Sequence, residues 1–202
     1  MLPRRQFISS LLISSGAFCV LSCGESQMDL PSRTTANGLA LVVSVLKHSY
    51  NVGEEVTFSC VVTNQGSSSV TILPWGDAID WLHLLDSHGR PAKEIPMASL
   101  DLKQWGPSAT DFVTLAPGDS FSRLFRGRVI RGNIKGFDHV LHKGLFVEFD
   151  YSALQIRKGV AYHAWAEYDG ARWARIYPEA MRTNNIFSGA LISQSVGFSF
   201  RD

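Results

Sequence analysis

The chain has 202 residues, which is enough for one domain or two with a sizeable core. Its 45% hydrophobic and 18% charged residues are typical of a globular protein and exclude wholesale disorder. The formal net charge is +1, and no cluster of Lys and Arg is dense enough to indicate a nucleic-acid-binding protein.

Residues 1–22 have the three parts of an export signal. Arg4 and Arg5 form a positive start, and "FISSLLISSGAFCVLS" is a short apolar stretch that ends directly before Cys23. This stretch is too short and too rich in Ser for a comfortable membrane-spanning helix. Residues 1–22 are therefore predicted to be a removable signal peptide. Its loss leaves 17 basic and 18 acidic residues, a net charge of −1.

The segment "VLSC" resembles the bacterial lipobox, in which the cysteine is lipidated and becomes the first residue of the mature protein; Leu21 departs from the usual smaller residue. The resemblance implies a lipid-anchored protein of the bacterial cell envelope, facing the periplasm or the exterior. Gly24 carries no Asp-type retention signal, which mildly favours the outer membrane. "RRQFI" also resembles a twin-arginine signal, and the route of export stays open. An ordinary cleaved signal, giving a periplasmic or secreted protein without an anchor, is the alternative.

The three cysteines then have separate fates. Cys19 leaves with the signal peptide, Cys23 carries lipid, and Cys60 stays alone in the domain. Without lipid on Cys23, a disulfide between Cys23 and Cys60 becomes available in an oxidising compartment. No spacing of Cys and His is typical of a zinc site, and the sequence predicts no metal and no cofactor.

Residues 23–37 are predicted to be the lipidated cysteine and a flexible polar tether, and residues 38–202 a folded domain. "LALVVSVL" begins the strand pattern, and "VTFSCVVT" alternates between an apolar and a polar face. Cys60 lies on the apolar face with Val56, Phe58 and Val62, so we expect a buried, inert thiol there.

Further short strands follow, separated by turns. Pro74 ends the strand "VTIL", and Gly89 is expected to have a positive φ in a hairpin between "WLHLLD" and "RPAKEI". Another turn, "APGD", joins "DFVTL" to "SFSRLFRGRVI". Residues 127–145 have the weakest pattern and are predicted to be an irregular connection or a short helix. The last predicted strands are "LFVEFDY", "VAYHAWAEYD" and "GALISQSVGFSF".

This spacing of strands predicts an all-β domain of the antiparallel β-sandwich type. The phrases "VVTNQGSSSVTILPWGDAID", "GPSATDFVTLAPGDS" and "FSGALISQSVGFSF" resemble, in order and spacing, the immunoglobulin-like domain that precedes the catalytic domain in deuterolysin-type and peptidyl-Lys metalloendopeptidases. The resemblance covers roughly residues 40–200 and implies an immunoglobulin-like fold. Gly159 and Tyr162 match the family's Gly-x-Tyr strand with one extra residue.

The protease itself is not implied. The HExxH motif of the family's catalytic domain is absent from the sequence, and "HVLHK" places His139 and His142 three residues apart without the general-base Glu. Asp138 beside them is interpreted as part of an exposed polar loop. Asp77 and Asp80 are interpreted as turn residues. No nucleophile or phosphate-binding motif is present, so the sequence predicts no catalytic residues and no enzyme.

Aromatic residues are the best candidates for a binding surface. Trp165 shares the more polar face of its strand with His163 and Glu167, and we expect it to be partly exposed. Trp105 and Trp173 come next because each lies near a turn. The alternative is that most of the five tryptophans fill the core.

Together these features favour a non-catalytic, lipid-anchored module that binds or assists another protein or envelope component. One alternative is a protease inhibitor or protease-associated domain, which would need a rigid loop such as "GDAID" or "QWGPSAT". Another is an enzyme whose site no motif reveals. The sequence does not identify the partner; it predicts membrane attachment through the lipid alone and no binding of nucleic acid.

Overall fold

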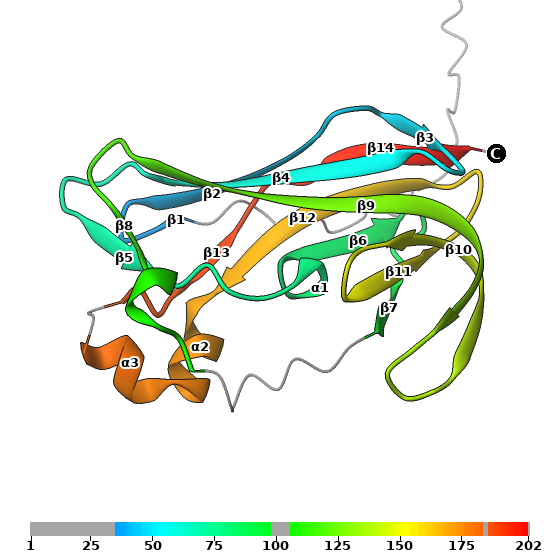
Figure 1. The fold of residues 1–202 in the computed structure, drawn as a ribbon. Coiled ribbons are helices and arrows are strands. Elements are labelled where there is room, and N and C mark those ends of the chain that lie inside the picture. Colours follow the sequence, from blue (N-terminus) through cyan, green and yellow to red (C-terminus); the bar gives the residue numbers. More distant parts are fainter. Residues whose placement is uncertain (1–34, 98–105, 184–185, 202) are drawn as a thin grey trace, which may run out of the picture.

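The computed structural model describes residues 35–97, 106–183 and 186–201. Arg4, Arg5, Cys23 and Trp105 lie outside the described residues. The domain is an all-β, sandwich-like fold of curled, mainly antiparallel sheets, as the strand pattern predicts (Figure 1). No helix in the described ranges is long and apolar enough to cross a membrane.

The larger sheet has seven strands, and its order shows that chain neighbours do not always pair. β9 lies at its centre, paired with β4 on one side and β10 on the other. In order across the sheet, the strands are β1 (Thr35–Ala36), β2 (Leu39–Val45), β4 (Glu55–Asn64), β9 (Ser120–Lys135), β10 (Leu141–Glu148), β11 (Ser152–Ile156) and β7 (Lys93–Pro96).

The second sheet packs across the first and is built around β12 (Ala161–Asp169). β12 pairs with β13 (Ala190–Ile192), β14 (Val196–Arg201) and β6 (Leu82–Asp86), all antiparallel. The short strand β3 (Ser49–Asn51) runs parallel to β14, which is a departure from the purely antiparallel prediction. A separate two-stranded sheet joins β5 (Val70–Ile72) to β8 (Val113–Leu115).

Short helices lie beside the sheets. α1 (Ala78–Trp81) precedes β6, a 3-10 turn covers Ala109–Asp111, and α2 (Gly170–Ile176) and α3 (Pro178–Thr183) follow β12. α2 and α3 cover a small second core made by Leu73, Trp173, Met181 and Ile186. Neither of these two helices is predicted by the sequence pattern.

The main core lies between the sheets, and the alternation within β4 forms part of it. Val56, Phe58, Cys60 and Val62 are all fully buried, which confirms the predicted apolar face. Burial raises the pKa of the Cys60 thiol to about 12, although the charge of the nearby Arg123 acts against the rise. Such a thiol is protonated at neutral pH, as expected for an inert core cysteine.

Tyr162 ties the start of β12 to the preceding turn. Its hydroxyl accepts a hydrogen bond of 2.7 Å from the backbone N–H of Arg157, and its ring is buried against Phe198 and Phe200. A tyrosine that bonds back to the backbone a few residues upstream is a feature of immunoglobulin-type sandwiches. The extra residue after Gly159 therefore does not prevent this bond.

The hairpin predicted between "WLHLLD" and "RPAKEI" forms only next to its turn. Leu85 of β6 forms one isolated bridge with Pro91, but β7, which begins at Lys93, crosses to the other sheet and pairs with β11. β8 likewise pairs with β5 rather than with β9. The turn glycines Gly89 and Gly118 do have positive φ, because each turn still reverses the chain before the strands separate.

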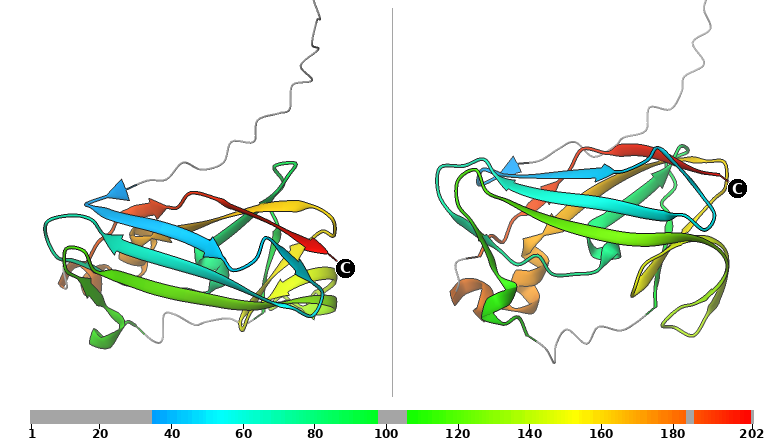
Figure 2. Two further views of the ribbon diagram at one scale, coloured as in Figure 1. Left: turned by 90° about the horizontal axis from the view of Figure 1, so that it is seen from above. Right: turned by 45° about the horizontal axis from the view of Figure 1, so that its top comes forward.

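The prediction for residues 127–145 is also wrong. This stretch contains the second half of β9 and the start of β10, joined as a long hairpin. Ile130 and Ile134 face a small core on the other side of the sheet, around Phe146. Because apolar residues of this hairpin serve two opposite faces, the simple alternation that marks β4 is lost. Figure 2 shows the hairpin curling away at the end of the molecule where β14 ends.

Candidate functional site

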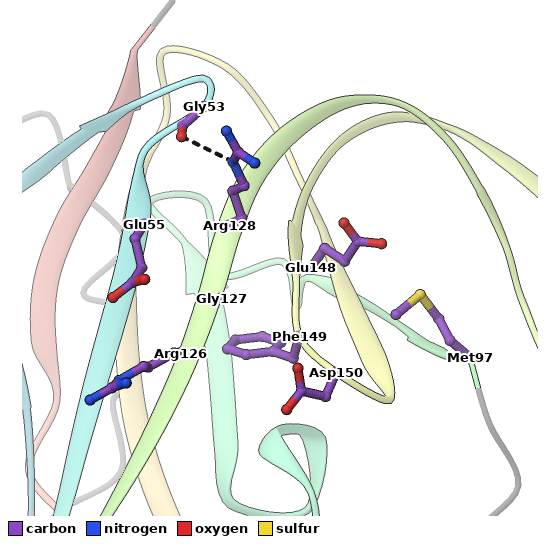
Figure 3. A pocket seen from close by; sticks show the side chains of 9 residues that line it. All are labelled: Gly53, Glu55, Met97, Arg126, Gly127, Arg128, Glu148, Phe149 and Asp150. Atoms are coloured by element: carbon purple, nitrogen blue, oxygen red, sulfur yellow. Dashed lines mark hydrogen bonds between the residues drawn. The ribbon is translucent and has the colours of Figure 1, made fainter.

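The candidate site is a group of hollows beside β9, where β10 leaves it. β10 ends at Glu148, whose partner on β9 is Arg128, and the chain then turns toward β11. The segment of β9 before Arg128 is therefore not covered by β10. A hollow of about 690 Å³ opens at this point (Figure 3). It is lined by Gly53, Glu55, Met97, Arg126, Gly127, Arg128, Glu148, Phe149 and Asp150.

The alternation of side chains along β9 determines which charged groups face this hollow. Phe125 and Val129 point into the core, so Arg126 and Arg128 point outward and are exposed. Arg128 lies between two acidic partners in register, Glu55 on β4 and Glu148 on β10. Opposite charges in such cross-strand pairs stabilise the sheet modestly. Arg128 also donates a 3.2 Å hydrogen bond from Nε to the carbonyl oxygen of Gly53.

Gly127 gives the hollow its floor. A Cβ atom at this position would lie 2.8 Å from Cγ1 of Val147 and 2.9 Å from Cε1 of Phe149. The absent side chain allows the Phe149 ring to lie directly against β9, as Figure 3 shows. The ring is buried, so the floor is apolar while the rim is charged.

Two further hollows adjoin the first one. One of about 280 Å³ lies between β9 and the start of α1 and shares Arg126, Phe149 and Asp150 with the first. Another of about 460 Å³ lies over β2, β4 and β9 and shares Glu55 and Arg126. Arg126 lines all three hollows. We call this region the Arg126 surface: Leu46, Glu55, Leu124, Arg126, Arg128, Glu148, Asp150 and Tyr151.

The chemistry of the Arg126 surface is mixed. Its two arginines face three carboxylates, so the surface carries a small net negative charge and no lysine. Leu46, Leu124 and Tyr151 are large and at least half exposed. Arginine and tyrosine are enriched at protein interfaces and lysine is depleted there. A balanced charge also gives no general attraction for polyanions.

Comparison with known proteins adds no further guide to this surface. No family model matches the chain, and no curated protein matches it either. The geometry of the domain is therefore the basis for any functional conclusion.

Trp165 is partly exposed, as predicted from its strand face. One side of its ring is covered by the His83 ring, which stacks on it with 5.3 Å between ring centroids. His83 also approaches Glu167 at 3.4 Å and Glu94 at 3.9 Å. Burial raises the pKa of the Glu94 carboxyl, although His83 acts in the opposite direction. Trp165 thus belongs to a packed polar cluster rather than to an open aromatic platform.

Trp173 does not contribute to an exposed surface, and the expectation for it is wrong. Only 3% of the residue is exposed, because α2 turns its side chain onto the second core. The Trp75 ring packs edge-on against it at 6.4 Å, and the Arg172 guanidinium lies over its ring at 5.3 Å. Trp105 lies outside the described residues.

The other residues weighed for chemistry have local structural roles. Asp77 caps α1 through a 2.6 Å hydrogen bond from the N–H of Ala78, and Asp80 accepts a 2.8 Å bond from the N–H of Asp77. This confirms their interpretation as turn residues. His142 and Asp138 are 4.0 Å apart in the β9–β10 hairpin. In the described ranges, no three His, Cys, Asp or Glu side chains are placed to share a metal ion.

Arg126 is not among the site residues predicted from the sequence. The signal was present in "SRLFRGR", where a predicted strand carries an arginine at positions 126 and 128 on one face. What could not be read from the sequence is where β10 ends. Because β10 ends at Glu148, the segment of β9 before Arg128 has no strand beside it on that side. Arg126 therefore lines three hollows.

Proposed function

We propose that this protein is a non-catalytic, lipid-anchored module of the bacterial cell envelope that binds another envelope protein through the Arg126 surface. The signal-like start and the "VLSC" segment support the anchor at Cys23, facing the periplasm or exterior and most simply on the outer membrane. The observation that carries the binding role is that one exposed arginine lines three adjoining hollows.

The features of the surface favour a protein partner. A rim of mixed charge around apolar side chains is typical of non-obligate protein interfaces. Arginine near the centre of such a patch is among the residues that contribute most to affinity. The partner expected here presents a carboxylate to Arg126 and apolar side chains to Leu124 and Tyr151.

The inhibitor alternative has less support. The "GDAID" segment forms the start of α1, and its Asp77 and Asp80 side chains are occupied by the cap. Ala78 is fully buried, so this segment is fixed to the domain rather than extended as a loop for a protease cleft. The other candidate loop, "QWGPSAT", lies partly outside the described residues.

Replacement of Arg126 by glutamate tests the binding role. We expect recovery of the partner from envelope extract to fall roughly 30-fold, because truncation or reversal of a central arginine costs about 2 kcal/mol or more. The measurement is a quantitative pull-down with the anchored protein. Arg182→Glu on α3 reverses an exposed arginine away from the Arg126 surface and should leave recovery unchanged. Equal losses for both variants, or no loss for Arg126→Glu, would overturn the proposed surface.

Replacement of Cys23 by alanine tests the anchor. We expect incorporation of labelled palmitate to be abolished and the protein to be released from membranes by a high-salt wash, since only the lipid gives salt-resistant attachment. Cys60→Ala is the matched control, because Cys60 is fully buried and its change leaves the lipid site intact. Palmitate incorporation that persists in the Cys23 variant contradicts the anchor.

A further inference from the structure

The tip of the β9–β10 hairpin exposes three large apolar side chains that belong to none of the hollows described above. Phe137 is 57% exposed, Val140 50% and Leu141 64%. They lie within five residues, at the point where the hairpin curls away from the sandwich (Figure 1). Single exposed apolar residues need no explanation, but three together at an apex do.

The hydrogen bonds of the tip hold it in one conformation. The N–H of Phe137 donates to the carbonyl oxygen of Pro96 at 2.8 Å, and the N–H of His139 donates to that of Gly136 at 3.0 Å. Val140 donates to the Asp138 carboxylate at 3.1 Å. His139 has a φ of 63°, and a Cβ on Gly136 would lie 2.5 Å from Oδ1 of Asp138. The apolar side chains are therefore presented by an ordered turn.

One face of the hairpin is buried and the other is open. Ile134 and Phe146 pack with Ile95 in the small third core, which attaches the hairpin to β7. The opposite face continues the inward-facing side of the sheet beyond the end of the main core. There Lys135 is the direct cross-strand partner of Leu141, and Lys143 follows on the same face.

The charge of the hairpin differs from that of the whole chain. Residues 130–143 contain Arg131, Lys135 and Lys143 against the single acidic residue Asp138, a net charge of +2 before any contribution from His139 and His142. The domain without its signal peptide has a net charge of −1. Positive charge is thus concentrated around the apolar tip.

We propose that this hairpin tip docks on an anionic lipid surface. Apolar side chains that insert into the interface, flanked by Lys and Arg that attract acidic headgroups, are the elements of reversible membrane-surface binding. The tip is the turn of a hairpin and lines none of the hollows above, which favours docking on a lipid surface over docking on a protein. This contact depends on neither Cys23 nor Arg126, and it would orient the domain on the membrane.

The test uses the chain from Gly24 onward, without signal peptide or lipid. All residues of the three cores lie between Ala36 and Phe200, so this chain keeps every one of them. We expect it to float with phosphatidylcholine vesicles that contain phosphatidylglycerol and not with phosphatidylcholine alone. Replacing Phe137, Val140 and Leu141 by serine should weaken partitioning roughly 100-fold.

A second variant tests the charges. Lys135→Gln with Lys143→Gln should weaken partitioning about 30-fold, because each basic residue near an anionic surface contributes about 1 kcal/mol. The matched controls are Val42→Ser, which removes a 48% exposed apolar side chain on β2, away from both the hairpin tip and the Arg126 surface, and Arg182→Gln. Both controls should float like the unmodified chain.

Three results would overturn the proposal. They are absence of binding to acidic vesicles, equal binding to neutral and acidic vesicles, and normal flotation of the serine variant with an unchanged melting temperature. Recovery of an acidic protein through the tip, with no vesicle binding, would assign the hairpin to a protein partner instead. Loss of vesicle binding leaves the Arg126 pull-down unaffected, so the two proposals fail separately.

Discussion

Asp86→Asn is expected to lower the free energy of unfolding by about 2 kcal/mol, because an amide cannot accept all the hydrogen bonds that this buried carboxylate accepts. Asp86 lies on β6 with 1% of its surface exposed. Its Oδ1 accepts hydrogen bonds of 2.9 Å from the backbone N–H groups of His88 and Arg90. Its Oδ2 accepts 2.8 Å and 2.7 Å bonds from the side chains of Arg90 and Arg157. An amide has one acceptor oxygen and cannot serve both sets.

The position of Asp86 explains why the loss should be large. Arg157 follows β11 of the seven-stranded sheet, while Asp86 belongs to the second sheet, so the ion pair joins the two layers at one end of the sandwich. Tyr162, whose hydroxyl accepts the bond from the Arg157 N–H, is the direct cross-strand partner of Asp86. Loss of the carboxylate therefore weakens the turn after β6 and the contact between sheets together.

The same carboxylate gives the stability a pH dependence with a definite sign. Burial alone raises the pKa of Asp86, but hydrogen bonds from the backbone and side chain of Arg90 and from the backbone of His88 outweigh it and lower the pKa from 3.8 to about 2. A lowered native pKa stabilises the fold above pH 3.8, and this contribution is lost as the pH falls toward 2. Asp86→Asn should remove this part of the acid sensitivity.

Chemical denaturation between neutral pH and pH 2 measures both effects. The matched control is Asp150→Asn, an exposed carboxylate of the Arg126 surface, which should change the free energy of unfolding by no more than about 0.5 kcal/mol. A fully stable Asp86→Asn protein with an unchanged acid transition would show that the network has no such role.

The fold class was predictable because the strongest signals are local. In β4 every second residue from Val56 to Val62 is apolar and buried, and β12 separates a polar from an apolar face in the same way. Glycines in the sequence also mark the turns: Gly53, Gly89 and Gly118 adopt the positive φ that these turns require. These features need no knowledge of which strands pair.

Partner choice between strands was not predictable from the same signals. β6 and β7 are adjacent in the chain, but β7 is drawn to the other sheet because Ile95 buries its side chain against Ile134 and Phe146. β11 was missed because it is short and buried at Ser152, Ala153 and Leu154 in succession, without alternation. Such contacts between distant segments determine where β10 ends and thus where the hollows beside β9 form.

The helices after β12 show the same limit for single residues. Trp173 lies near a turn in the sequence, which suggests exposure, yet α2 rotates it onto Leu73 and Met181. The partial exposure of Trp165 was predicted correctly from its strand face, because side chains along a strand alternate with a fixed two-residue period. A residue in a short helix has no comparable constraint until the surface it packs against is known.

Arg123→Leu is expected to lower the free energy of unfolding by about 2 kcal/mol, because two partly buried carbonyl oxygens lose their donor and a cation–π contact is lost. Arg123 reaches from β9 to the segment before α1 and donates to the carbonyl oxygens of Pro74 and Gly76. Its guanidinium also lies 5.7 Å from the centre of the Trp81 ring and 5.1 Å from that of Phe125. Burial lowers the pKa of this guanidinium, and the nearby Asp77 and Asp80 oppose that effect.

Arg123→Lys separates the two parts of this contribution. A lysine keeps the charge over the rings, but its single ammonium group does not reproduce the planar fork that reaches two carbonyl oxygens, so we expect it to recover less than half of the loss. Arg126→Leu, three residues along the same strand and exposed, is the control and should change the free energy of unfolding by about 0.5 kcal/mol at most. Thermal and denaturant unfolding measure all three variants.

Equal stability of the Arg123 and Arg126 variants would mean that the segment before α1 is held by its own cap and not by β9. If only the Arg123 variants lose stability, β9 has two roles. Arg123 on one face holds the segment before α1, and Arg126 on the other face is presented to solvent.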